Sequence, residues 1–66
     1  MTPKQADKII KAGKPVTFHN SSYNETFTGT PISRNRWDIN IQYTTPNNTT
    51  QTGIFDRGDL EIINPQ

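Results

Sequence analysis

The stretch TGIFDRGDLEII, residues 52–63, decides the fold, because it places two short apolar segments on either side of a tight polar turn. Its centre, Arg57-Gly58-Asp59, matches a tripeptide found in cell-adhesion ligands. The strand-forming residues on both sides favour a turn instead, in which Gly58 takes a positive φ and Asp56 or Asp59 caps backbone amides. We therefore predict two terminal strands joined by a turn, not an adhesion site.

The clearest single strand lies upstream, in RWDINIQY, residues 36–43. Apolar and polar residues alternate there with the period of two that is typical of a strand with one buried face. The residues expected on the buried face are Trp37, Ile39, Ile41 and Tyr43. A long polar loop, TTPNNTTQ, follows and predicts a hairpin connection to the last two strands.

Two further strands are predicted, one in residues 16–20 and one in residues 25–34. The first, VTFHN, alternates Val16 and Phe18 with polar residues, and the second, ETFTGTPISR, is rich in threonine. Gly29 and Pro31 interrupt the second strand and indicate a bulge, a bend or an edge position. A bend there would let a small sheet curl and close its own edges.

Residues 2–13, TPKQADKIIKAG, predict one short helix ahead of the strands. Thr2 suits the N-cap, Pro3 the first helical position, and Gln5 completes a capping box with Thr2. The terminal glycine of this segment supplies a left-handed stop. Because so short a helix is marginal alone in water, Ile9 and Ile10 are expected to pack on the strands rather than on a second copy of the chain.

Length and composition indicate a single small domain, residues 1–66, with the strands in residues 15–63. The chain has 29% hydrophobic residues, no cysteine and a formal net charge of +1. Its stability should depend on a small core, in which Trp37→Ala is expected to cost about 3–5 kcal/mol. The predicted core is Ile9, Val16, Phe18, Phe27, Ile32, Trp37, Ile39, Ile41, Ile54, Leu60 and Ile62.

The strand pattern, with a tight turn before the final DLEII strand, resembles the Src-homology-3-like small barrels. The resemblance covers residues 16–63 as a pattern of strands and implies a mainly β, five-stranded small barrel with one short N-terminal helix. The ALYDY-type motif of true Src-homology-3 domains is absent, so binding of proline-rich peptides is not carried over. A short chain rich in threonine and asparagine with this layout also looks like small accessory proteins of bacteriophages.

Several functional classes are disfavoured by the residue inventory. One histidine, His19, and no cysteine make a zinc site poor chemistry, and the scattered glycines form no phosphate-binding loop. We therefore predict no metal, no cofactor and no enzymatic activity. No apolar run approaches the roughly 18 residues of a membrane span, and no signal peptide is visible. A cytoplasmic location without membrane contact is the expectation.

The functional class that remains is a non-enzymatic protein-binding module. We expect a phage-encoded adaptor or inhibitor of a host protein. The candidate partner-binding residues are Tyr23, Arg34, Arg36 and Arg57. Tyr23 lies among small polar residues, so it either caps the core or anchors a partner. Arg34 and Arg36 flank a turn, where guanidinium groups suit bidentate contact with carboxylates. The sequence leaves the partner and the oligomeric state open.

Weak binding of single-stranded nucleic acid is the alternative. The basic candidates are Lys14, Arg34, Arg36 and Arg57, and the stacking candidates are Tyr23, Trp37 and Tyr43. Seven basic residues nevertheless meet six acidic ones, which is an even balance for a nucleic-acid-binding domain. Protein binding is therefore the preferred hypothesis.

Overall fold

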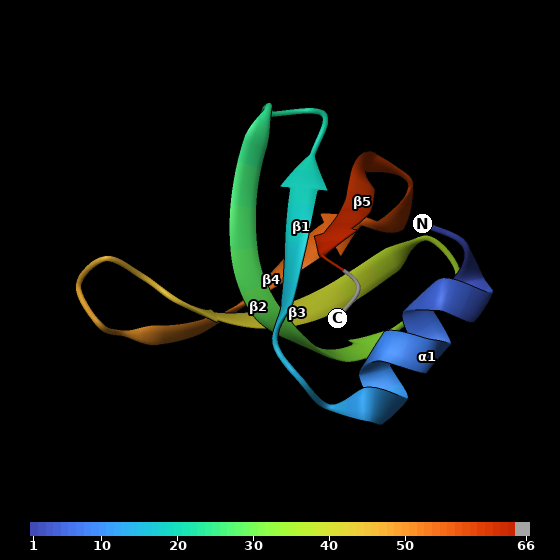
Figure 1. The fold of residues 1–66 in the computed structure, drawn as a ribbon, viewed down its shortest axis with the longest axis horizontal. Helices are drawn as coiled ribbons and strands as arrows, with labels where there is room; N and C mark the ends of the chain where they lie inside the picture. Colours follow the sequence, from blue (N-terminus) through green and yellow to red (C-terminus); the bar gives the residue numbers. More distant parts are fainter. Residues whose placement is uncertain (65–66) are drawn as a thin grey trace.

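The computed structural model describes residues 1–64, which form one short helix followed by five strands (Figure 1). A single turn of 3-10 helix separates the last two strands, where the sequence predicts a tight turn. The elements are α1 (Pro3–Ala12), β1 (Val16–Asn20), β2 (Glu25–Arg34), β3 (Asp38–Thr44), β4 (Thr50–Asp56), η1 (Arg57–Asp59) and β5 (Leu60–Asn64). The prediction of a mainly β chain with one N-terminal helix is confirmed.

Helix α1 begins and ends as its sequence predicts. The Thr2 hydroxyl accepts a hydrogen bond from the Gln5 amide at 3.1 Å, and the Gln5 side chain accepts one from the Thr2 amide at 2.9 Å. This capping box satisfies amides that the first turn leaves without partners. Gly13 follows the helix with a φ of 67°, a left-handed conformation that glycine adopts without a Cβ clash.

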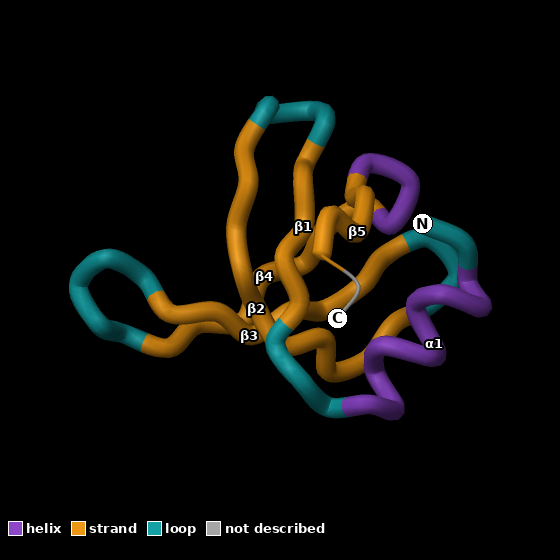
Figure 2. Tube along the Cα trace, viewed as in Figure 1, coloured by secondary structure: helices purple, strands orange, loops and turns teal. Residues whose placement is uncertain are grey.

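The five strands described in residues 1–64 form one antiparallel sheet in the order β4-β3-β2-β1-β5 (Figure 2). Strand β2 joins the two halves, since it pairs with β1 up to Gly29 and with β3 from Thr30 onward. A Cβ built on Gly29 would lie 2.5 Å from Ile41 Cγ2, so only glycine lets β3 approach this closely. The register then shifts between Pro31 and Ser33. The bend predicted from Gly29 and Pro31 is confirmed.

The sheet is open, so the predicted closed barrel is not confirmed. Strands β4 and β5 are the two ends of the hydrogen-bonded order in the described part of the chain. β4 pairs with β3, and β5 pairs with β1. The outer edge of β4 therefore presents backbone groups that no neighbouring strand satisfies.

The core is small and is formed mainly by residues of β1, β3 and β5, with one buried residue from α1. Its buried apolar members are Ala6, Val16, Phe18, Ile39, Ile41 and Leu60. Partly buried hydrophobic residues surround them: Met1, Ile9, Ile10, Phe27, Phe55 and Ile62. Ile9 and Ile10 thus pack on the strands, as predicted.

Three residues of the predicted core are exposed instead. Trp37 is 67% exposed because it lies in a bend before β3, where strand alternation does not apply. Ile54 is 73% exposed because Phe55, its neighbour on β4, is the residue that turns toward the core. Ile32 is exposed at the register shift of β2. The prediction that Trp37 belongs to the core is therefore wrong, and this removes the reason for expecting a cost of about 3–5 kcal/mol for Trp37→Ala.

The Arg57-Gly58-Asp59 turn is helical. The Asp56 carboxylate accepts a hydrogen bond from the Gly58 amide at 2.8 Å and caps the single turn η1. The prediction that Asp56 or Asp59 caps this turn is confirmed. The predicted positive φ at Gly58 is wrong, since among the glycines described it occurs at Gly13.

Candidate protein-binding site

Arg34, the first of the predicted partner-binding arginines, is committed to an internal contact. Its Nε donates to Asp7 Oδ1 at 2.6 Å and its Nη2 donates to Asp7 Oδ2 at 2.9 Å, which joins β2 to α1. This hydrogen bond lowers the pKa of the Asp7 carboxyl below its usual value and raises the pKa of Arg34. The guanidinium fork of Arg34 therefore secures the helix and is occupied by Asp7.

Arg57 is also engaged within the fold. Its Nη1 donates to the Met1 carbonyl at 2.7 Å, and its Nη2 donates to the Arg36 carbonyl at 2.8 Å. The half-buried side chain thus connects η1 to the first residue and to the β2–β3 turn. Arg57 holds separate segments together, which leaves little of it for a partner.

Arg36 is exposed at the β2–β3 turn, and its guanidinium lies 5.5 Å from the centre of the Trp37 ring. The turn that carries this pair is fixed by the Asn35 side chain. Its oxygen accepts hydrogen bonds from the Trp37 amide at 2.9 Å and the Asp38 amide at 2.7 Å. Arg36 and Trp37 therefore form an exposed cation–π pair on a defined turn.

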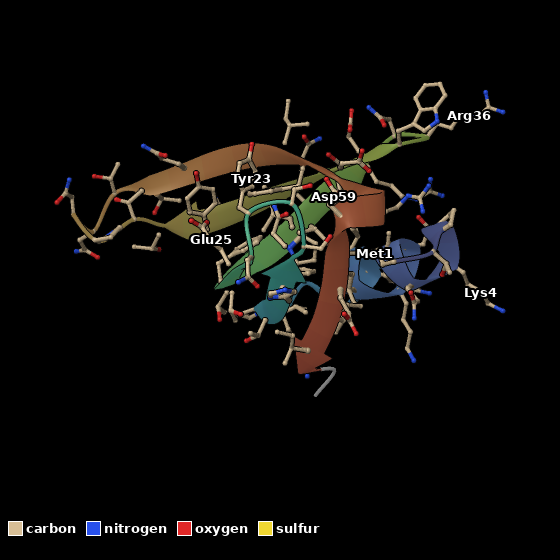
Figure 3. All side chains as sticks on the ribbon, turned by 90° about the horizontal axis from the view of Figure 1, so that it is seen from above. Met1, Lys4, Tyr23, Glu25, Arg36 and Asp59 are labelled. Atoms are coloured by element: carbon tan, nitrogen blue, oxygen red, sulfur yellow. The ribbon has the colours of Figure 1, made fainter. Side chains whose placement is uncertain are left out.

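Tyr23 is 74% exposed in the β1–β2 hairpin, so it does not cap the core. The loop of the hairpin is anchored by Ser21 and Ser22 rather than by the tyrosine ring. Ser22 Oγ donates to Asp59 Oδ2 at 2.6 Å, and the Ser21 amide donates to the Asp59 carbonyl at 2.9 Å. Tyr23 and Arg36 lie apart, in the middle and at one end of the molecule (Figure 3). The structure therefore does not gather the predicted residues into one site.

An aromatic pocket of about 160 Å³ lies between the first residues of β2 and the strands β3 and β4. Its three rings come from three adjacent strands: Phe27 on β2, Tyr43 on β3 and Phe55 on β4. Phe27 and Phe55 stack with centroids 4.9 Å apart, and Tyr43 meets each of them edge-on. Glu25 is the charged residue of the lining.

Gly53 on β4 makes room for two of these rings. A Cβ at this position would lie 2.9 Å from Phe55 Cε1 and 3.0 Å from Tyr43 Cε1. The glycine therefore lets both side chains lie across the strand. All three rings remain half-exposed, because no further element of the described chain covers them.

Sequence reasoning identified only part of this pocket. Tyr43 was expected on the core face of its strand and Phe27 in the core, whereas Phe55 and Glu25 were not singled out. The spacing of Glu25 and Phe27 by two residues is the signal that could have placed both on one face of β2. Phe55 was not identifiable in this way, because the adjacent Ile54 is an equally apolar choice for the inward position.

No protein-family model, curated protein or solved structure matches this chain. The described residues hold no cluster of three or more histidine, cysteine or acidic side chains placed to bind a metal ion. They also contain no helix with the length and apolar character to cross a membrane. The resemblance to Src-homology-3-like barrels and the bacteriophage origin stay predictions.

Proposed function

We propose that this protein is a non-enzymatic protein-binding module, and that its partner binds at the aromatic pocket beside the Tyr23 hairpin. The observation that supports this site is the set of three half-exposed rings drawn from three strands. Aromatic side chains contribute large contact areas with few rotatable bonds, which is why they dominate the energy of many interfaces.

The neighbourhood of the pocket offers two kinds of contact. Phe55 lies on β4, whose outer edge is unpaired, so an extended partner segment can add to the sheet through backbone hydrogen bonds. Tyr23 stands on the adjoining hairpin and exposes its ring. Backbone pairing would supply affinity, and the pocket would select one side chain of the partner.

We further propose that the fold is an open form of the Src-homology-3-like small barrel. The strand order β4-β3-β2-β1-β5 and the helical turn η1 between the last two strands support this assignment. A long second strand that bends and contributes to both halves of the sheet supports it as well.

Binding of single-stranded nucleic acid is the second candidate, and the exposed Arg36–Trp37 pair favours it. The engagement of Arg34 and Arg57 in internal contacts argues against it, because it removes two of the basic groups that would face a phosphate backbone. A mobility-shift assay with a mixed oligonucleotide pool at two salt concentrations tests it. Salt-sensitive binding that Trp37→Ala abolishes would support this second candidate.

A random-peptide display library panned on the folded protein tests the proposed site. The peptides that bind the wild type should include a class that loses affinity for Tyr43→Leu, which keeps most of the apolar volume but removes one ring, and for Tyr23→Ser. Trp37→Ala is the matched control, because it removes an exposed aromatic side chain at a distant turn. Peptides that tolerate both tyrosine changes but not Trp37→Ala would overturn the assignment of the site.

A further inference from the structure

A second concavity, separate from the aromatic pocket, lies between helix α1 and the strands β1 and β5. It has a volume of about 230 Å³, and one stripe of α1 forms its helical wall. Val16 and Ile62 belong to the strands on the other side. The residues that line this α1 groove are Gln5, Lys8, Ile9, Ala12, Lys14, Val16 and Ile62.

The groove exists because α1 is attached along a different stripe of its surface. Ala6 is fully buried, and Asp7 is joined to Arg34 of β2. These contacts hold the helix on β2, while the stripe at positions 5, 8, 9 and 12 faces the groove. Those positions follow the spacing of one helical face, so a single side of α1 is presented to a ligand.

The charges around the α1 groove have one sign. Among the residues that the structure describes, Lys8 and Lys14 are the charged residues that line the groove, and none of its lining residues is acidic. The acidic residue of α1, Asp7, is neutralised by Arg34 on the other side of the helix. Lys4 and Lys11 add two further positive charges to the same helix.

The apolar lining residues Ile9, Val16 and Ile62 form the floor of the groove, since they are buried or half-buried whereas the two lysines are exposed. An apolar floor below a positively charged rim complements a segment that carries both an apolar side chain and carboxylates. The phosphates of a nucleic acid would pair with the lysines but would leave the apolar floor uncovered. The apolar floor therefore favours a peptide, which can supply an apolar side chain as well.

We propose that the α1 groove binds an acidic peptide segment of a partner protein, with one apolar side chain on the floor and carboxylates paired with Lys8 and Lys14. The volume suits a single large apolar side chain. The α1 groove is formed by other elements than those that form the aromatic pocket. The two sites can therefore be tested independently.

Counter-selection in a random-peptide display library tests the proposal. Peptides are selected on the wild type and then sorted by loss of binding to Ala12→Phe, which fills the groove from an exposed position, and to the pair Lys8→Glu with Lys14→Glu. The peptides lost on both should carry Asp or Glu around one apolar residue. Their affinity should fall about tenfold or more with the lysine pair.

Lys4→Glu is the matched control, since it makes the same charge change on α1 outside the groove lining and should leave the affinity nearly unchanged. The proposal is overturned if no selected peptide distinguishes Ala12→Phe from the wild type. It is also overturned if the lysine pair abolishes binding to phosphatidylserine vesicles or a mixed oligonucleotide but not to peptides. Tyr43→Leu should not affect these peptides, which separates this result from the test of the aromatic pocket.

Discussion

Strands β1 and β4 both direct successive side chains to opposite faces of the sheet, but the two strands have very different surroundings. β1 is a central strand with neighbours on both sides, and Val16, Phe18 and Asn20 are all buried along it. β4 is an edge strand whose inward residue Phe55 is only half-buried and whose outward residue Ile54 is exposed. The difference shows that an alternating pattern produces a core only where a second layer covers the strand. Where the cover is missing, the same pattern leaves a surface available for binding.

The largest expected effect is at the centre of β1. Phe18 is fully buried and lies 5.5 Å from Phe27, ring centre to ring centre. Phe18→Ala should lower the free energy of unfolding by about 3–5 kcal/mol, because it removes a buried ring and leaves a cavity. Urea denaturation followed by circular dichroism measures this change. A cost under roughly 1 kcal/mol would contradict the position of the core.

Replacing a glycine should cost more stability in the packed interior than at the open pocket on β4. Gly29→Ala should cost about 1–3 kcal/mol, because its Cβ would meet Ile41 Cγ2 at 2.5 Å and the Gln42 carbonyl at 2.9 Å. Gly53→Ala should cost less, since its close neighbours are the rings of Tyr43 and Phe55 at the open pocket, which can move aside. Equal losses in urea denaturation would show that the pocket is as tightly packed as the interior.

The contact between Asp7 and Arg34 should make stability depend on pH. The folded protein lowers the pKa of Asp7 from its ordinary value of 3.8, so this contribution is present above that value and is lost as the pH falls through the lowered pKa. Asp7→Asn should therefore reduce the Tm at neutral pH but not in strong acid. Glu61→Gln, an exposed carboxylate on β5, is the control. If Asp7→Asn still lowers the Tm in strong acid, the contact with Arg34 does not explain the dependence of stability on pH.

The smallest effect is expected on the outer face of β4. Ile54→Ser should change the free energy of unfolding by no more than about 0.5 kcal/mol, because the side chain is mostly exposed already. Phe55→Ser should cost clearly more, since it removes a ring that stacks on Phe27. Chemical denaturation of the two variants side by side measures the contrast. The reverse order would mean that the inward face of β4 has been misassigned.

Local signals in the sequence predicted most of the architecture. The Thr2–Gln5 capping box, the glycine stop and the Gly29–Pro31 bend depend on residues close together in the chain, and all three are confirmed. The prediction that Trp37 is buried is wrong, because Trp37 lies in the bend before β3, where the alternation of a strand does not apply. Strand boundaries are set by backbone pairing, which apolar spacing does not reveal.

Contacts between distant residues explain the remaining differences. Arg34 looks like a free arginine in its own segment, and only the folded chain brings Asp7 to within 2.6 Å of it. The aromatic pocket likewise needs Phe27, Tyr43 and Phe55 from three strands, whose relative register the sequence leaves undetermined. Tyr23 and Arg36 keep their exposed positions because no distant partner covers them in the described structure.

The aromatic pocket formed by Phe27, Tyr43 and Phe55 is the proposed binding site of the partner. The most direct measurement is a two-dimensional NMR titration of the isotopically labelled protein with a library-selected peptide. We expect the largest shift changes at Phe27, Tyr43 and Phe55 and along the outer edge of β4, with the resonances of Phe18 little affected. Shift changes confined to the Arg36–Trp37 turn, with the three pocket residues unchanged, would contradict the claim.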